Sequence, residues 1–434
     1  MKKILFAAAF AMSVIANAQS PETVHRCSST EYLKQIQENF PEEYAAIKQA
    51  EEAAAAYSAS TTTYKSNGGV YTIPVVVHVV YKLASQNIDD EFIYSQIDVL
   101  NEDYRRLNDD ADETPAAFEG LAADAQIEFC LAQQDEDGIV TTGITRTETD
   151  ITSWDLFTGG GADDYADNVK FTDKGGEDGW DRSSYLNIWV CNLAPGLLGY
   201  ATPPGAAPLK DGVVIGYKYF GDGSPGGVYN KGRTTTHEVG HWLGLYHTWG
   251  DDDFQPEPQC GGSDLIGDTP NQEDATYGAP SFPKLDDCAP TSPGIMFMDY
   301  MDYADDGSMN MFTQDQVNKM RDILESTRSS ILSSPGCQTG VTGIQDILKK
   351  QLIQLTVSPN PSSGAFVFEV KNFEHEDVTF EIYNMMGEVI DRMILQNAPE
   401  LHVSFDGSNL SAGNYFVKAS DGEFTLTQKI TITK

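Results

Sequence analysis

Basic residues are scarce in this chain. Its 434 residues include 28 Lys and Arg against 65 Asp and Glu, which leaves a formal net charge of −37. A surface of this sign repels phosphate groups, so nucleic acids and anionic membrane surfaces are not expected as partners. Most of the acids are expected to be solvated, although Asp-rich loops also offer oxygen ligands to calcium. The length is sufficient for two or three domains with cores of their own.

Apolar runs of membrane-spanning length are missing as well. The run from Ile4 to Ile15 follows two lysines and precedes Ala16-Asn17-Ala18, which is the pattern of a secretory signal peptide cut after Ala18. It is too short to cross a bilayer, and no later run reaches that length. We therefore expect a signal peptide at 1–18 and no transmembrane segment. The mature protein is expected to be secreted or held at the cell surface after export through the periplasm.

Histidine is rare and unevenly distributed. Three of the seven histidines lie in H-E-V-G-H-W-L-G-L-Y-H, from His237 to His247. On a helix, His237 and His241 project from one face, where both imidazoles can bind one zinc ion. His247 can join them only if the chain turns after the second, and Gly244 tolerates the positive φ of such a turn. Glu238 lies beside the pair, placed to take a proton from water. The alternative is an amphipathic helix with surface histidines.

The segment that follows the signal peptide is polar and Ala-rich. Residues 19–67 look like a propeptide, with a loose helix from Glu31 to Ala56 and an exposed tract after it. Its one cysteine, Cys27, offers a thiolate that could fill the zinc position needed by the catalytic water, which would make the precursor latent. The alternative is an incidental or disulfide-bonded cysteine.

The next block has the pattern of an α/β domain. The β-branched run from Ile73 to Tyr81 predicts a strand buried on both faces, with His78 in the core. Further strands are expected at Ala125 to Gln133 and Tyr185 to Leu193. Between the first two strands, the spacing predicts a helix whose buried stripe comprises Ile93, Ile97, Leu100, Tyr104 and Leu107.

Several shorter features carry expectations of their own. Gly159 to Gly179 is expected to be a surface loop, and Val213 to Tyr219 a short strand placed as an edge to which an extended peptide could add. Thr234 to Thr236 supply hydroxyls suited to capping the zinc helix. Cys130 and Cys191 are either buried thiols or a cross-strand disulfide, and their spacing does not decide.

Methionine is concentrated downstream of the zinc motif, with five of the eleven between Met296 and Met311. Such a cluster is ordinarily core filler, but zincins of the extended type place a Met-containing turn beneath the three imidazoles. Thr313 and Gln316 then form a capping box that opens a helix. The apolar residues predicted to share one face of this helix are Val317, Met320, Leu324 and Ile331.

Together, H-E-V-G-H-W-L-G-L-Y-H-T-W and M-D-Y-M-D-Y-A-D-D-G-S-M-N-M-F-T resemble the pappalysin family of metzincins, including its bacterial cytophagalysin-like members. The resemblance covers roughly Val70 to Cys337 and implies an α/β metzincin catalytic domain at 68–337. Such a domain has a twisted mixed sheet, a zinc helix and a C-terminal helical subdomain with a Met-turn. Met301 would be the Met-turn residue, and Tyr303 the tyrosine that stabilises the reacting oxyanion. His25-Arg26-Cys27-Ser28 resembles the family's propeptide segment whose cysteine blocks the zinc.

The resemblance also bears on the cysteines. Cys260 and Cys288 sit where family members have a disulfide between the zinc helix and the Met-turn, and export to an oxidising compartment favours that bond. A second family disulfide is missing, because Ala279 and Ser308 occupy its two positions. The partner of Cys337 stays open.

One departure concerns substrate preference. Gly307 stands where relatives that cut before basic residues carry Asp, at the floor of the pocket for the residue after the scissile bond. Preference for Arg or Lys is therefore open, although Asp305 and Asp306 are close by.

A loop within C-G-G-S-D-L-I-G-D-T-P-N resembles the family's calcium loop, with Asp264, Asp268 and Thr269 as the candidate ligands. Carboxylate and carbonyl oxygens in a Gly-rich loop suit this hard cation. The alternative is a set of ordinary loop acids.

The last part of the chain reads as a separate unit. A linker at 338–350 leads to alternating apolar and polar runs at 351–434, the pattern of a small all-β sandwich. S-P-N-P at Ser358 to Pro361 and L-S-A-G-N-Y-F-V-K at Leu410 to Lys418 resemble the C-terminal sorting domain of type IX secretion. That resemblance implies the outer-membrane secretion machinery as a partner. The alternative is a carbohydrate- or protein-binding module.

The expected function is zinc-dependent hydrolysis of protein or peptide substrates by a secreted endopeptidase made as a latent precursor. Zinc activates water, and Glu238 moves the proton as general base and then general acid. The rival reading is a catalytically weak surface adhesin or binding protein on a zincin scaffold. Retention of Glu238 argues against it, because an inactive scaffold is free to lose its base.

Overall fold

The structure is a computed structural model that describes residues 25–60, 69–136, 138–155, 167–250, 260–338, 354–371, 377–383, 389–396, 400–420 and 425–433. The expected signal peptide and almost all of the expected linker lie outside the described residues. The chain divides into two compact units, one comprising Met1–Glu136 and Thr141–Cys337, the other Asp137–Val140 and Gln338–Lys434.

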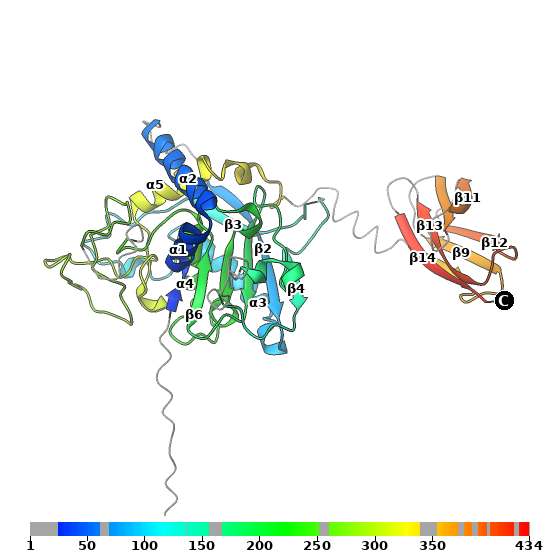
Figure 1. The fold of residues 1–434 in the computed structure, drawn as a ribbon, viewed down its shortest axis with the longest axis horizontal. Coiled ribbons are helices and arrows are strands. Elements are labelled where there is room, and N and C mark those ends of the chain that lie inside the picture. Colours follow the sequence, from blue (N-terminus) through cyan, green and yellow to red (C-terminus); the bar gives the residue numbers. More distant parts are fainter. Residues whose placement is uncertain are drawn as a thin grey trace, which may run out of the picture. The chain divides into compact units, whose positions relative to one another are not determined.

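A seven-stranded mixed sheet runs through the first unit (Figure 1). Its order is β1-β6-β7-β5-β2-β3, and β4 also pairs with β2. Every neighbouring pair runs parallel except β6 and β7, which run antiparallel. The strands are β1 His25–Cys27, β2 Tyr71–Tyr81, β3 Ile127–Leu131, β4 Ile144–Glu148, β5 Leu186–Cys191, β6 Leu197–Ala201 and β7 Val213–Gly216.

The central strand β2 is buried on both faces, as its β-branched sequence predicts. His78 lies in it with no exposed surface, and its ring nitrogens pair with Thr145 Oγ1 at 2.8 Å and Asn187 Oδ1 at 3.0 Å. Burial lowers the pKa of His78 to about 4, so the ring stays neutral. The prediction of a core histidine is confirmed.

Three longer helices pack on this sheet or beside it: α3 Asp90–Tyr104, α4 Arg233–Trp242 and α5 Gln314–Glu325. The predicted capping box of Thr313 and Gln316 opens α5, but the helix ends at Glu325, so its predicted apolar face is wrong at Ile331, which lies in the 3-10 turn Ser329–Ser333. The predicted stripe of α3 is wrong at one end, because the helix stops at Tyr104 and Leu107 is 67% exposed. The short 3-10 turns are η1 Ala84–Gln86, η2 Ala111–Glu113, η3 Asn168–Lys170, η4 Thr172–Lys174, η5 Pro208–Lys210, η6 Tyr217–Tyr219, η7 Asp306–Ser308 and η8 Ser329–Ser333.

Residues 25–60, called the N-terminal segment below, form β1 and two helices rather than the one predicted. These are α1 Ser29–Asn39 and α2 Pro41–Ser60, and the break comes at Pro41, whose ring and missing N–H do not fit a helix interior. In Figure 1 this segment is blue, and α2 lies beside the yellow helix α5. The predicted surface loop at 159–179 lies partly outside the described residues, and the rest of it contains η3 and η4.

Two predictions about elements near the zinc motif are wrong. β7 is internal, between β5 and β6, so Val213 to Tyr219 offers no free edge. The edge strand on this side is β1, which pairs with β6. The threonines do not cap α4 either, because the N-cap is Gly232 and the helix begins at Arg233. Thr235 and Thr236 lie inside the first turn, where their hydroxyls donate to Gln96 and Asp103 of α3.

Two disulfides close loops in the first unit. Cys260 and Cys288 are joined, as the family resemblance predicted. Cys130 is joined to Cys337, 207 residues away, which excludes a bond between Cys130 and Cys191. Cys191 is a buried free thiol in β5. The second bond ties the end of the unit back to β3.

The second unit consists of two antiparallel sheets, ordered β11-β10-β13-β14 and β12-β9-β8. Side chains from both sheets, including Phe368 and Phe380, share one core. The strands are β8 Gln354–Ser358, β9 Ala365–Lys371, β10 Asp377–Tyr383, β11 Val389–Gln396, β12 Glu400–Asp406, β13 Gly413–Ser420 and β14 Thr425–Ile432. In the described part of the chain, no helix is both long and apolar enough to cross a membrane.

Candidate metal centre and active site

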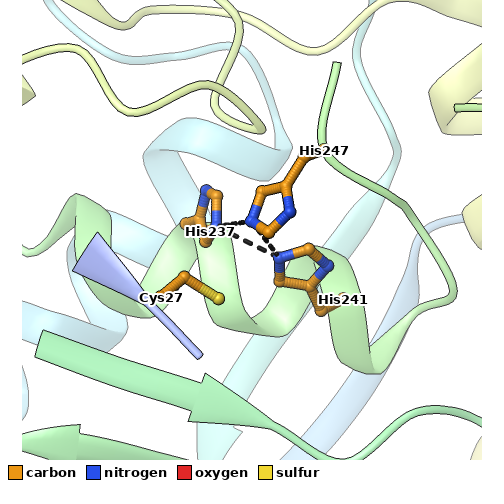
Figure 2. Close-up of side chains that lie close together, drawn as sticks. All are labelled: Cys27, His237, His241 and His247. Atoms are coloured by element: carbon orange, nitrogen blue, oxygen red, sulfur yellow. Dashed lines mark hydrogen bonds between the residues drawn. The ribbon is translucent and has the colours of Figure 1, made fainter. Parts of the chain in front are cut away.

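The three histidines of the motif converge on one point. The Nε2 atom of His241 lies 3.1 Å from those of His237 and His247, and the last two lie 3.2 Å apart. The Cys27 sulfur belongs to the same group, in which all four ligand atoms lie within 4.8 Å of one another. Figure 2 shows His237 and His241 on α4, His247 on the irregular segment that follows α4, and Cys27 on β1. All four residues are buried.

The hydrogen bonds of the imidazoles fit a bound cation. His237 Nδ1 lies 2.6 Å from the Tyr300 carbonyl oxygen, and His241 Nδ1 lies 2.8 Å from that of Leu245. A carbonyl only accepts, so each Nδ1 carries the proton and each Nε2 presents a lone pair. Burial and the neighbouring imidazoles hold the pKa of His237 well below its usual range.

Lone pairs facing one another at this distance repel unless a cation lies between them. A zinc ion with bonds of about 2.0–2.1 Å in a tetrahedron separates its nitrogen ligands by about 3.3 Å, close to the spacing found here. The residues present therefore fit zinc, with the thiol of Cys27 as a fourth ligand.

Gly244 produces the turn that returns His247 to the centre. Its φ is +87°, and its N–H donates to the His241 carbonyl at 2.8 Å while Leu245 N–H donates to that of Gly240. A Cβ at Gly244 would lie 3.0 Å from Ile323, so α5 packs closely against this turn. Backbone conformation and packing both favour glycine here.

Glu238 lies beside the histidines with no exposed surface. Its Oε2 accepts from Ser29 Oγ at 3.0 Å and from Cys27 Sγ at 3.3 Å, while Oε1 has no hydrogen-bond partner among the described residues. Burial raises the pKa of Glu238 to about 8, although the hydrogen bonds from Cys27 and Ser29 oppose the shift. Gly199 of β6 leaves the room that this side chain needs, because a Cβ there would lie 3.0 Å from Glu238 Cγ.

Tyr303 and Met301 make different contacts near the metal centre. The Tyr303 hydroxyl donates to the Cys27 carbonyl oxygen at 3.1 Å, and its ring packs 4.9 Å from that of His247. Met301 is fully buried and packs against α4, where a Cβ at Gly240 would come within 2.5 Å of its sulfur. Tyr303 thus already binds a peptide carbonyl, and Met301 supports the helix that carries two of the histidines.

Sequence reasoning missed an ion pair next to the centre. Arg26 Nη2 lies 3.0 Å from Asp306 Oδ1, and neither side chain has any exposed surface. The Arg26 guanidinium also donates to the Ala304 carbonyl and lies over the ring of Tyr229. Gly307 takes no part, since a Cβ there would meet nothing within 4 Å. The acid at this place is the neighbouring Asp306.

The first residue of α4 holds Asp306 in position. Arg233 Nη1 donates to the Asp306 carbonyl oxygen at 2.6 Å, and its guanidinium binds both carboxylate oxygens of Asp110 at 2.6 Å. Asp306 Oδ2 in turn accepts from Lys231 N–H at 2.9 Å. The carboxylate is therefore fixed by groups on α4 and beside it, and its Oδ1 is directed at Arg26.

Trp249 is a second residue that sequence reasoning missed. Its ring stacks on His247 with centroids 4.4 Å apart and planes 5° apart, and it meets the Tyr303 ring edge-on at 4.8 Å. The motif gave a weak hint, because Trp249 closes the H-T-W run. Trp249 thus packs on both the His247 ring and the Tyr303 ring and restricts their orientation.

The candidate calcium residues lie in one loop but contact one another only in part. Thr269 Oγ1 donates to Asp264 Oδ2 at 2.6 Å, and Asp268 Oδ2 accepts from the Asp315 N–H of α5 at 3.0 Å. Burial raises the pKa of Asp264 to about 6. Asp268 Oδ1 is buried without a hydrogen-bond partner among the described residues.

Family models match both parts of the chain. The model of the pregnancy-associated plasma protein-A peptidase family matches residues 170–325, and that of the secretion system C-terminal sorting domain matches residues 356–433. An extracellular metalloprotease of Arthroderma benhamiae is 31% identical over 254 residues, which are 57% of this chain and 76% of the relative. One of Pyricularia oryzae is 30% identical over 340 residues, 76% of this chain and 98% of the relative.

Solved structures give the same result. A mutant of Tannerella forsythia promirolysin is 47% identical, with a TM-score of 0.63, over 70% of this chain and 96% of that one. Mature mirolysin of the same organism, in complex with a cleaved peptide, is 51% identical with a TM-score of 0.58, over 61% of this chain and 97% of that one. The buried histidine centre and these relatives agree: this chain belongs to the pappalysin family of metalloendopeptidases and carries a C-terminal sorting domain for secretion.

Proposed function

We propose that this secreted metallopeptidase cleaves peptide bonds with water at the three-histidine centre, and that Glu238 transfers the proton. The observation that carries the proposal is the convergence of three Nε2 atoms beside a buried carboxylate. Zinc bound by His237, His241 and His247 would polarise the substrate carbonyl and lower the pKa of a water molecule toward neutrality.

The chain's own residues perform the remaining steps. Glu238, the neighbour of His237 on α4, would take a proton from the attacking water and give it to the leaving amine. The Tyr303 hydroxyl, which here donates to the Cys27 carbonyl, would donate to the oxygen of the tetrahedral intermediate. Met301 would be the Met-turn residue, acting through its contact with α4.

We infer that residues 19–67 are a propeptide that blocks each of these groups. Cys27 takes the fourth ligand position, Ser29 occupies the Glu238 carboxylate, and the Cys27 carbonyl occupies Tyr303. Burial and Glu238 raise the pKa of the Cys27 thiol in the absence of an ion, whereas a bound cation favours the thiolate. The existence of both promirolysin and mature mirolysin supports a precursor of this kind.

Replacing Cys27 by Ala should make the unprocessed precursor active. The substitution removes the fourth ligand and frees a coordination position, while Arg26 and Ser29 still hold the segment in place. We expect partial activity, at least about tenfold above the wild-type precursor, measured with a fluorogenic peptide on chains kept intact by purification at low temperature. The matched control is Cys191→Ala, a second buried thiol far from the histidines in sequence. A Cys27→Ala precursor no more active than wild type would remove the thiol from the latency mechanism.

We further propose that the pocket for the residue after the scissile bond takes Arg or Lys. Arg26 precedes Cys27, the residue at the metal centre, and its guanidinium is fully buried against Asp306. A buried carboxylate without a cationic partner is costly, so the pocket left by a departing propeptide favours a basic substrate side chain. Asp306 would thus bind the basic side chain of the substrate, which Gly307 cannot do because it has no side chain.

Removal of zinc tests the proposed function directly. Treatment of the processed enzyme with 1,10-phenanthroline should abolish casein hydrolysis, because three imidazoles and water remain with no cation to polarise the carbonyl. Addition of stoichiometric Zn²⁺ should restore activity, and atomic absorption measures how much zinc the enzyme has bound. If the processed, zinc-loaded enzyme cleaves neither casein nor any peptide in a proteome-derived library, the protease hypothesis is rejected in favour of a surface adhesin or binding protein.

We assign calcium to the loop with Asp264, Asp268 and Thr269, where the unpartnered Asp268 Oδ1 offers an oxygen ligand. A calcium-selective chelator serves as the second arm of the metal experiment. It should lower Tm without removing zinc, and Asp268→Asn should cancel that response.

The remaining boundaries are also proposals. We place signal-peptide cleavage after Ala18, the catalytic domain at 68–337, the linker at 338–350 and the sorting domain at 351–434. The matched sorting domain supports engagement of the outer-membrane secretion machinery after transit of the periplasm.

A further inference from the structure

A cavity of about 490 Å³ lies between the N-terminal segment and the rest of the first unit, next to the metal centre. Leu33 of α1 and Ala54 of α2 line it from the side of the segment. Its opposite wall is mainly apolar and comes from the end of β6, the turn after α4, the loop that follows and α5, with Pro203, Pro204, Leu265, Ile266 and Ile323. The metal ligand His241 also lines the cavity.

The pairing of β1 with β6 fixes where this cavity lies along the active site. His25 is opposite Leu197 and Cys27 is opposite Gly199, and Ser29 Oγ then accepts from Ala201 N–H at 2.9 Å. Residues 26, 27 and 29 thus contact in turn the Asp306 pocket, the metal centre and the edge of the cavity. The cavity is therefore on the far side of the metal centre from Asp306.

This order of contacts indicates which part of a substrate would reach the cavity. If the Asp306 pocket holds the residue after the scissile bond, residues before that bond must extend in the opposite direction along β6, past Ala201 toward Pro203. The inference rests on the proposed function, because it takes the direction of the substrate from the assigned pocket.

We propose that, once the propeptide has left, this cavity is an apolar groove that binds side chains on the amino-terminal side of the scissile bond. Leu33 holds the place of such a side chain in the precursor, where it is only 5% exposed. A leucine-sized side chain suits a wall of proline, leucine and isoleucine, whereas a carboxylate there would lose its water and meet two acids, Asp315 and Asp322, against one base, Lys319. The substrate class is therefore a peptide with an apolar residue before the cut and a basic residue after it.

Leu265 makes the groove testable without disturbing the core. Leu265 is 58% exposed in the precursor. Its φ is +60°, a left-handed conformation that Asn adopts more readily than Leu. Leu265→Asn therefore removes apolar wall without backbone strain. The matched control is Leu209→Asn, a 75% exposed leucine on η5 that does not line the cavity.

The experiment measures kcat/KM of the processed enzyme on peptides that keep Arg after the scissile bond. Leu, Ser or Asp is placed at each of the four positions before it. We expect Leu to exceed Asp by about tenfold or more at one position at least. Leu265→Asn should reduce that ratio several-fold and leave the preference for Arg unchanged, while Leu209→Asn should alter neither.

The outcomes separate this inference from the proposed function. Equal cleavage of the Leu, Ser and Asp peptides at all four positions, with Arg still preferred after the bond, would reject the groove and leave the protease standing. An apolar preference that survives Leu265→Asn intact would place the binding wall elsewhere. Cleavage of no peptide at all would reject the protease and the groove together.

Discussion

Glu238→Gln should leave the metal centre loaded and remove almost all hydrolysis. Gln has the shape of Glu but accepts no proton, so water loses its base and the leaving amine loses its acid. General acid–base catalysis by one positioned group contributes about 10²–10⁴-fold, and we expect a loss in kcat of that order with zinc content unchanged. The measurement is steady-state peptide hydrolysis by the processed variant, with zinc counted per chain.

A control for the substitution itself is available on β3. Glu128→Gln makes the same chemical change at a side chain that is 41% exposed and paired with Arg105, and it should leave kcat within about twofold. Zinc lost together with activity in Glu238→Gln would point to a structural role. Full activity with full zinc would exclude Glu238 as the base.

Asp306→Asn should largely abolish the preference for a basic residue after the scissile bond. Its Oδ2 position can still accept from Lys231 N–H, but the Oδ1 position would present an amide instead of a carboxylate to the guanidinium. Breaking a buried pair by removing one partner costs about 3–5 kcal/mol, or roughly 10²–10⁴-fold. We expect kcat/KM for peptides with Arg to fall by that factor relative to peptides with Gln at the same position.

The ratio of two peptides is the informative quantity, because it is insensitive to partial misfolding. Asp305→Asn, at the adjacent acid, is the matched control and should keep the wild-type ratio. An Arg to Gln ratio unchanged in Asp306→Asn would mean that the ion pair serves only the precursor. The same variant should then still lose propeptide affinity, which inhibition of the processed enzyme by the isolated segment would reveal.

The metal centre was predictable from sequence because its determinants are local. His237, His241 and His247 lie within eleven residues, and the periodicity of a helix plus one glycine at positive φ is sufficient to bring them together. The capping box of α5 is local in the same sense. The disulfide between Cys260 and Cys288 came from the family resemblance rather than from any such rule.

Features made by distant residues escaped prediction. Arg26 and Asp306 are 280 positions apart, and Cys130 and Cys337 are 207 apart, so no periodicity relates them. The edge of the sheet was misplaced for a related reason. The sequence of β7 shows a short apolar strand, but strand order is set by crossovers and by the entry of β1 from the N-terminal segment. The predicted threonine cap of α4 was wrong because Gly232, and not a threonine, precedes the first helical residue.

The contacts that we propose to block the active site are made by Arg26, Cys27 and Ser29, which all lie well before the end of α2. A cut after Ser60 therefore breaks none of these contacts; it only turns a tethered inhibitor into a free one. While tethered, such a segment acts at an effective concentration near the millimolar range, and after cleavage only its actual concentration counts. Dilution in the surrounding medium would then make the cleaved segment dissociate. The enzyme would therefore gain its activity outside the cell that made it.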